Sequence, residues 1–259
     1  MNPVVVATFE RSGTHLTIDL LRKNFKACRC WRLPGEHLER SYVNLDRLSQ
    51  ETLWPMTISQ MKRQLKRGSR PVVKTHTTPR LEKFEGAARD FCQDLLAHSK
   101  VIYVVRDPRK VMVSYQLMRQ GRPAASAEQL EEFLTTKEAN GMTPVERWEN
   151  HVKSWQTTED TLILKYEDIV KNTYGVIQQI SAFLEIDPIN RKDFLPKKIE
   201  SPWQRRFMRI TQFNPESTAV LARGKSSNYR PILWEGFKTK KTELLLKEAE
   251  ESLFGMKSV

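Results

Sequence analysis

The sequence has no long apolar run. No stretch approaches the roughly 18 consecutive apolar residues that a membrane-spanning helix needs. Met1, Asn2 and Pro3 lead directly into a valine-rich segment, without the charged and apolar regions of a secretory signal peptide. These absences argue against a membrane protein and against a secreted one. We therefore expect a soluble, cytoplasmic protein.

The sequence also lacks a long linker and internal repeats. Its 259 residues are enough for one well-buried core, and no segment is long enough to separate two independent domains. An apolar fraction of 39% argues against a disordered chain. We expect one folded domain that covers residues 1–259.

Cysteine is scarce. The three cysteines, at positions 28, 30 and 92, provide no disulfide framework. Cys28-Arg29-Cys30 has neither the ligand spacing nor the second ligand pair of a zinc site. The sequence therefore predicts reduced thiols and no metal site.

Acidic residues are too few to balance the basic ones. Lysine and arginine together number 43 and aspartate and glutamate 31, which gives a formal net charge of +12. Such an excess favours an anionic ligand, and it leaves nucleic acid, a membrane surface and a multiply phosphorylated small molecule as alternatives. A generally basic, solvated surface without a ligand is the remaining explanation.

Four short, β-branched apolar runs are present, and each is typical of a buried strand. They cover residues 4–8, 72–75, 101–105 and 162–166. Apolar residues at helical spacing lie between them, and two helix starts are recognisable: Asp107-Pro108, and the capping box Thr143-Pro144-Val145-Glu146. This alternation predicts an α/β domain with a central, mostly parallel sheet and helices on both faces. Ligands of such sheets bind beyond the carboxyl ends of the strands. The segments to search are therefore residues 9–15, 76–79, 106–109 and 167–168.

The first of these segments contains Arg11-Ser12-Gly13-Thr14. At a helix start, unpaired backbone N–H groups, two hydroxyls and the positive end of the helix dipole suit a phosphate. The Gly-Lys-Ser/Thr triplet of magnesium-dependent phosphate loops is absent, so a phosphate here would depend on Arg11 and backbone donors without a metal. The alternative is that Ser12 and Thr14 only cap the helix and that Arg11 is a surface cation.

A histidine follows the second predicted strand. His76 comes two residues after Lys74, so we expect both side chains on the same face of that strand. A neutral imidazole beside a fixed cation has a lowered pKa and can act as a general base near neutral pH. A purely structural histidine is the alternative.

Arg106 ends the third predicted strand, where a charged side chain is costly unless it meets an anion. Ser114 lies about two turns into the helix that follows. An ordinary surface pair between Arg106 and Asp107, with a helical serine, is the alternative. Residues 222–230 form a basic loop that either closes over a phosphate or simply connects two surface segments.

Taken together, these segments resemble the sulfotransferases that use 3′-phosphoadenosine-5′-phosphosulfate (PAPS), in particular their cytosolic branch. That family has a Lys-Ser-Gly-Thr-Thr-Trp loop, a Lys-Thr-His strand end, an Arg with a Ser eight residues later, a Tyr-Glu-Asp segment and an Arg-Lys-Gly loop. The matching segments, in the same order, are Arg11-Ser12-Gly13-Thr14-His15-Leu16, Lys74-Thr75-His76, Arg106 with Ser114, Tyr166-Glu167-Asp168 and Arg223-Gly224. Residues 148–155 are also similar to a family helix with the same Trp, His and Trp spacing.

The resemblance implies a P-loop-like nucleotide-binding fold and transfer of a sulfuryl group from PAPS to a hydroxyl or amine of a small-molecule acceptor, without a metal. PAP is the product that it implies. It makes His76 the general base, Lys74 the residue that stabilises the transferring group and Arg11 the one that stabilises the leaving phosphate. Its cofactor-binding residues here are Arg11, Ser12, Gly13, Thr14, His15, Leu16, Arg106, Ser114, Tyr166, Arg223, Gly224 and Lys225, with Trp203 as a substitute for the family's adenine-stacking tryptophan.

Two other functions stay open at the level of the sequence. A P-loop kinase of small metabolites would need the missing Gly-Lys-Ser/Thr triplet and a magnesium ligand. A basic nucleic-acid-binding protein would need a clustered basic and aromatic surface, whereas the basic residues here concentrate at predicted strand ends. We therefore expect no nucleic-acid partner, and a homo-oligomer is left as one alternative for the assembly.

Overall fold

The computed structural model describes residues 2–31, 33, 36, 38–49, 55–122, 124–190, 193–196, 203, 206–207, 210 and 239–254. The strands in this part of the chain are β1 (Val4–Thr8), β2 (Val43–Asn44), β3 (Val72–Thr75), β4 (Lys100–Val105) and β5 (Thr161–Lys165). The α-helices are α1 (Thr14–Asn24), α2 (Ile58–Leu65), α3 (Gly86–Ala97), α4 (Pro108–Gln120), α5 (Ala127–Thr135), α6 (Pro144–Gln156), α7 (Tyr166–Lys171), α8 (Thr173–Leu184) and α11 (Lys240–Phe254). The short 3-10 helices are η1 (Lys26–Cys28), η2 (Leu38–Ser41) and η3 (Leu45–Leu48).

The strands form one five-stranded sheet in the order β2-β3-β1-β4-β5, and all neighbouring pairs are parallel. Val5 of β1 lies opposite Val73 of β3 and Val101 of β4, which aligns the carboxyl ends of the three central strands. The predicted parallel sheet is therefore confirmed. The two-residue strand β2 was not predicted, and Tyr166, expected to end the last strand, instead begins α7.

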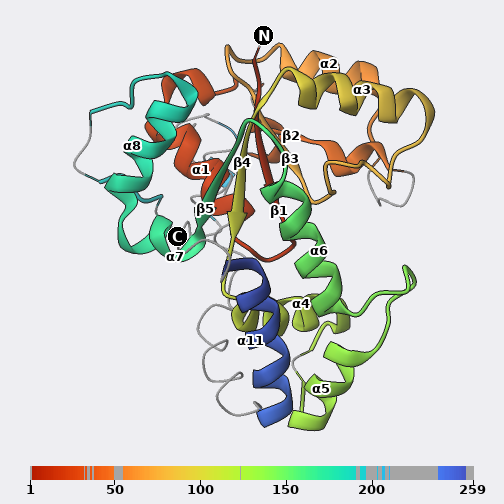
Figure 1. The fold of residues 1–259 in the computed structure, drawn as a ribbon. Helices are drawn as coiled ribbons and strands as arrows, with labels where there is room; N and C mark the ends of the chain where they lie inside the picture. The colour runs from red at the N-terminus through yellow and green to blue at the C-terminus, as the bar shows by residue number, and fades with distance from the viewer. Residues whose placement is uncertain are drawn as a thin grey trace.

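Helices cover both faces of the sheet, as the strand sequences require. Alternate residues of β1 enter two separate cores: Val5 and Ala7 pack with α2, α3 and α6, whereas Val4 and Val6 pack with α1, α7 and α8. Figure 1 shows these two groups of helices on opposite sides of the strands, with α4, α5 and α11 gathered beyond the carboxyl ends. The carboxyl edge is therefore bordered by helices on several sides.

Local sequence explains why two of the helices begin where they do. The Asp107 carboxylate accepts a hydrogen bond from the Arg109 N–H, and Pro108 occupies the first turn of α4, as predicted. The predicted capping box of α6 is also confirmed, because Thr143 and Glu146 bond each other's backbone N–H groups. Within the described ranges, no helix is both long and apolar enough to cross a lipid bilayer.

Candidate active site

The loop between β1 and α1 has a constrained backbone. Arg11 has a φ of 71° and Gly13 a φ of 110°, both in the left-handed region that side-chain-bearing residues avoid. A Cβ atom on Gly13 would lie 2.4 Å from the ring of Tyr166. Glycine is needed there for its conformation and for the space that Tyr166 fills, whereas Arg11 is held against its preference, as happens at ligand-binding turns.

The hydroxyls of this loop do not cap α1. Gly13 is the N-cap and provides no side-chain bond, while Thr14 Oγ1 lies 2.6 Å from Thr8 Oγ1. The interpretation of Ser12 and Thr14 as simple caps is therefore wrong. Ser12 Oγ is buried without a hydrogen-bond partner in the described chain, and the first N–H groups of a helix have no partner inside the helix. These donors point to an anionic ligand at the helix start.

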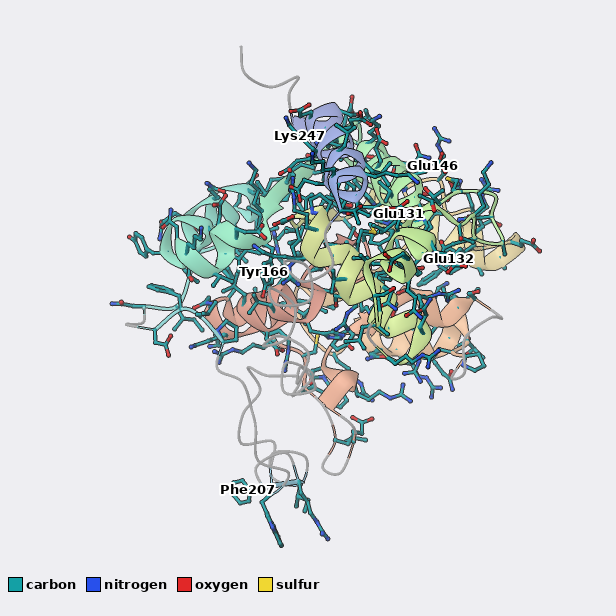
Figure 2. All side chains as sticks on the ribbon, turned by 90° about the horizontal axis from the view of Figure 1, so that it is seen from below. Glu131, Glu132, Glu146, Tyr166, Phe207 and Lys247 are labelled. Carbon is teal, nitrogen blue, oxygen red and sulfur yellow. The ribbon has the colours of Figure 1, made fainter. Side chains whose placement is uncertain are left out.

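Two arginines meet beside this loop. Arg11 Nε donates to Ser114 Oγ at 2.7 Å, and Arg106 donates to the Arg11 carbonyl oxygen at 3.1 Å. The Arg106 guanidinium lies over the ring of Tyr166, 4.2 Å from its centroid, and Figure 2, a view from the carboxyl side, shows Tyr166 beside α1. The structure thus brings together four predicted residues that are far apart in the sequence: Arg11 of the β1–α1 loop, Arg106 just after β4, Ser114 of α4 and Tyr166 of α7.

This arginine pair has no counter-charge among the described residues. Neither Arg11 nor Arg106 forms an ion pair there, and Arg106 Nε is buried without a hydrogen-bond partner. Burial and the nearby charge of Arg106 both lower the pKa of Arg11. Two half-buried cations without a carboxylate repel each other, so an anion placed between them would stabilise both. The alternatives of a surface cation and of an Arg106–Asp107 surface pair are therefore wrong, since Asp107 pairs with Arg109 and Lys110.

His76 lies just beyond the end of β3, with its imidazole fixed by the neighbouring strand. Its Nδ1 is 2.8 Å from the Thr8 carbonyl oxygen, which can only accept, so Nδ1 carries the proton and Nε2 the free lone pair. The His76 backbone N–H donates to Asp46 of η3 at 2.9 Å. The imidazole is therefore held in the tautomer that a general base acting through Nε2 needs.

The surroundings of His76 keep its imidazole neutral near pH 7. Burial lowers the pKa of His76, and the positive charge of Lys74 lowers it further. The carboxylates of Asp46 and Glu10 act in the opposite direction. The predicted influence of Lys74 on this histidine is thus present, together with two acidic neighbours that were not predicted.

A second charged cluster, the Glu10–Arg147–Glu138 cluster, lies on the other side of the loop and was not predicted from the sequence. Arg147 of α6 pairs with Glu10 at 2.7 Å and with Glu138 at 3.4 Å. Burial raises the pKa of Glu10, but the positive charge of Arg147, with smaller contributions from His76 and Lys83, outweighs burial and lowers the pKa to about 2. The pair between Glu10 and Arg147 joins residues 137 positions apart, so the only sequence signal was the position of Arg147 four residues before His151 on one helix.

The remaining predicted residues have varied positions. Leu16 is buried in the core around α1, and the His15 ring packs edge-on against Tyr42, so their side chains serve the fold while their N–H groups lie in the first turn of α1. Trp203 is 76% exposed, and in the described part of the chain no ring contact joins it to Tyr166. Arg223, Gly224 and Lys225 lie outside the described residues.

The family model of the sulfotransferase domain matches residues 1–233. The chain belongs to the sulfotransferase family. Among relatives of this sulfotransferase-family chain, sulfotransferase 2A6 of Rattus norvegicus is 30% identical over 139 residues, which are 51% of this chain and 42% of the relative. Sulfotransferase 2B1 of Mus musculus is 27% identical over 189 residues, 70% of this chain and 49% of the relative. The matched stretches thus span less than half of either relative.

Solved structures share the fold over nearly the whole chain. A crystal structure of mouse sulfotransferase SULT7A1 complexed with PAP covers 99% of this chain and 84% of its own, with a TM-score of 0.53 and 18% identity. Retinol dehydratase, solved in a complex with retinol and PAP, covers 100% of this chain and 83% of its own, with a TM-score of 0.50 and 20% identity. At such identities the likeness concerns the fold alone, and it agrees with the α/β, P-loop-like architecture predicted from the sequence.

Proposed function

We propose that this chain is a PAPS-dependent sulfotransferase that transfers a sulfuryl group to a hydroxyl or amine of a small-molecule acceptor. The observation that carries the proposal is the pair of half-buried cations, Arg11 and Arg106, at the start of α1 without a carboxylate within the described chain. Such a pair fits a ligand with several phosphate groups. Membership of the sulfotransferase family and the PAP complexes of two proteins of the same fold support PAPS as that ligand.

In this proposal each residue has a distinct role. His76 Nε2 takes the proton from the acceptor as the acceptor oxygen or nitrogen forms a bond to sulfur. Arg11 stabilises the negative charge on the phosphate that leaves when its bond to sulfur breaks, and Lys74 stabilises the equatorial oxygens of the transferring group. Positioning and cationic stabilisation of this kind supply most of the rate enhancement in related group transfers.

The nucleotide-binding residues follow from the same arrangement. The backbone N–H groups and hydroxyls of Ser12, Gly13 and Thr14 would hold the 5′-phosphosulfate, with His15 and Leu16 contributing N–H groups from the first turn of α1. Arg106 and Ser114 would bind the 3′-phosphate, and Tyr166 would lie beside the adenine. Contributions from Trp203 and from Arg223, Gly224 and Lys225 stay predictions, as do the single domain over residues 1–259, the cytoplasmic location and the independence from metal.

The test separates nucleotide binding from transfer. We expect PAP, added without magnesium, to raise the unfolding temperature of the wild type and of His76→Ala alike. Transfer of labelled sulfate from PAPS to a panel of phenols, alcohols and amines should fall by about 10²- to 10⁴-fold in His76→Ala, because it lacks the general base. His98→Ala is the matched control, since His98 is an exposed histidine on the far end of α3.

Three results would contradict the proposal. If PAP does not stabilise the wild type, or if ATP with magnesium displaces PAP, the ligand is wrong. If PAP binds but His76→Ala transfers sulfate as fast as the wild type, His76 is not the base. This third outcome, the one that concerns His76, leaves the nucleotide assignment standing.

A further inference from the structure

One face of α6 contacts both segments that carry the proposed chemistry. Arg147, His151 and Trp155 are spaced four residues apart and so lie on the same side of the helix. Arg147 pairs with Glu10 of the β1–α1 loop at 2.7 Å. His151 Nε2 lies 3.1 Å from the His76 carbonyl oxygen, and Trp155 Nε1 donates to the Thr77 carbonyl oxygen at 3.1 Å. The spacing between the loop and the histidine is therefore set by a single rigid element.

The contact of His151 with His76 has a fixed donor. A carbonyl oxygen can only accept, so His151 Nε2 carries the proton and its Nδ1 accepts from the Tyr103 hydroxyl at 2.9 Å. Burial lowers the pKa of His151 to about 4, which keeps this imidazole neutral. The backbone of His76 is thus held from α6 by an uncharged hydrogen bond, and the charged contact on this face comes from Arg147 alone.

Arg147 is itself held from several sides. Its guanidinium lies 4.8 Å from the ring centroid of Phe9 and 4.9 Å from that of Tyr115. Glu138, which pairs with Arg147, also accepts a hydrogen bond from the Tyr115 hydroxyl at 2.8 Å. Cation–π contacts and two carboxylates leave the side chain only 21% exposed, so its position is well defined.

Glu10, the partner of Arg147, immediately precedes the strained turn. The next residue, Arg11, has the left-handed φ of 71° and carries one of the two unpaired cations. A turn of this kind persists only when its surroundings fix it. We propose that Arg147 is a positioning residue: through Glu10 it fixes the β1–α1 loop, the proposed site of the 5′-phosphosulfate, relative to His76, whose backbone the same helix also holds. This inference rests on the proposed function.

The pair also shapes the electrostatic environment of His76. The groups that face His76 are the Thr8 carbonyl and hydroxyl from β1, Lys74 from β3, Asp46 from η3, Glu10 from the loop and His151 from α6. Among these, Glu10 raises the pKa of His76, and Arg147 partly neutralises Glu10. Removing either member of the ion pair should therefore move the pKa of His76, in opposite directions.

The experiment uses two variants that separate position from charge. Arg147→Met keeps much of the length and the ring contacts but releases Glu10, so kcat should fall by about 10- to 100-fold, with a smaller change in the KM for PAPS. The uncompensated Glu10 should raise the pKa of His76, seen by NMR and in the acid limb of the pH–rate profile, by about 0.5 unit or more. Glu10→Gln still accepts a hydrogen bond from Arg147, so kcat at high pH should change little while the pKa of His76 falls.

Two further variants complete the design. Arg147→Lys should restore part of kcat, because it keeps the charge but loses the planar, two-sided contact. Lys153→Met is the matched control, since Lys153 pairs with Glu149 on the solvent side of the same helix. It should leave kcat and the pKa of His76 unchanged.

The outcomes distinguish this inference from the proposed function. If wild type binds PAP and transfers sulfate, but Arg147→Met lowers only the unfolding temperature and leaves kcat and the pKa of His76 as in Lys153→Met, Arg147 is merely structural and the inference is overturned. If both single variants shift the pKa of His76 in the same direction, the electrostatic part is overturned. If the wild type does not bind PAP, the proposed function fails and the positioning role fails with it.

Discussion

Two clusters of charged side chains flank the loop after β1, and they differ in balance. Arg11 and Arg106 form a cationic pair, and no carboxylate of the described residues forms an ion pair with either of them. On the other side, Arg147 is paired with Glu10 and Glu138. Neighbours in sequence, Glu10 and Arg11 thus belong to clusters of opposite character.

The difference separates charges that stabilise the fold from charges that bind the ligand in the proposed function. A half-buried ion pair stabilises its surroundings only when both partners are present, so removing one partner is costly. Two half-buried cations without a partner contribute repulsion, which an anionic ligand converts into attraction. Variants of the cationic pair, Arg11 and Arg106, should therefore change ligand binding more than stability. Variants of the Glu10–Arg147–Glu138 cluster should change stability more than ligand binding.

The largest expected effect comes from the cationic pair. Arg106→Met should weaken PAP binding by about 100-fold, because a partly desolvated charge contact to phosphate is lost. The free energy of unfolding without ligand should change by less than about 1 kcal/mol, since the lost contacts to Tyr166 and the Arg11 carbonyl are offset by relief of repulsion. Calorimetric titration with PAP and urea unfolding measure the two quantities. A large loss of stability with unchanged PAP affinity would reverse the comparison.

The balanced cluster should respond in the opposite way. With the pKa of Glu10 lowered to about 2, its ionised form stabilises the fold above the unfolded-state pKa of 4.5, and this contribution is lost as the pH falls toward 2. Glu10→Gln mimics the protonated carboxyl, so it should lower the free energy of unfolding by up to about 3 kcal/mol at pH 7. The difference from wild type should shrink between pH 4.5 and 2, as followed by urea unfolding at several pH values. A pH-independent difference would exclude ionisation of Glu10 as its cause.

The smallest expected effect sharpens the comparison between buried and exposed cations. Lys110 lies in the same segment as Arg106 but is 42% exposed and reaches Asp107 at 3.5 Å and Glu167 at 3.9 Å. Lys110→Met should change the free energy of unfolding by less than about 0.5 kcal/mol. PAP affinity should change by less than about threefold, because an exposed and paired cation is screened by solvent. A loss of affinity comparable to that of Arg106→Met would mean that the net charge of the protein, and not the cationic pair of Arg11 and Arg106, governs PAP binding.

Much of the fold could be predicted because its signals are local. The runs of valine in β1 and β3 and the caps at Asp107 and Thr143 each act over a few residues, and each is found where expected. Strand β2 was missed because a strand of two residues is too short to show a recognisable pattern of apolar and polar residues. The end of the last strand was misplaced by one residue at Tyr166, since a strand and the first turn of the next helix share apolar composition there.

The candidate site was predictable as a set of segments but not as a geometry. Because carboxyl ends of parallel strands meet at one edge, Arg11, His76 and Arg106 were expected to lie at the same edge of the sheet. Sequence could not tell that Arg11, rather than Arg106, bonds Ser114, or that Arg106 stacks on Tyr166. These contacts depend on the side-chain rotamers, which the order of strands and helices along the chain does not determine.

By itself, the sequence determined four of the five strands of the described sheet, the basic excess and the chemical groups at the ends of those strands, because hydrophobic period, caps and charge are properties of neighbouring residues. Only the tertiary structure decided which charges are paired. Arg147 meets Glu10 across 137 positions, whereas no carboxylate in the described chain reaches Arg11 or Arg106. The reason is physical: the energy of a charge depends on its burial and on its neighbours within a few ångströms, and the packing of α6 and α1 on the sheet sets both.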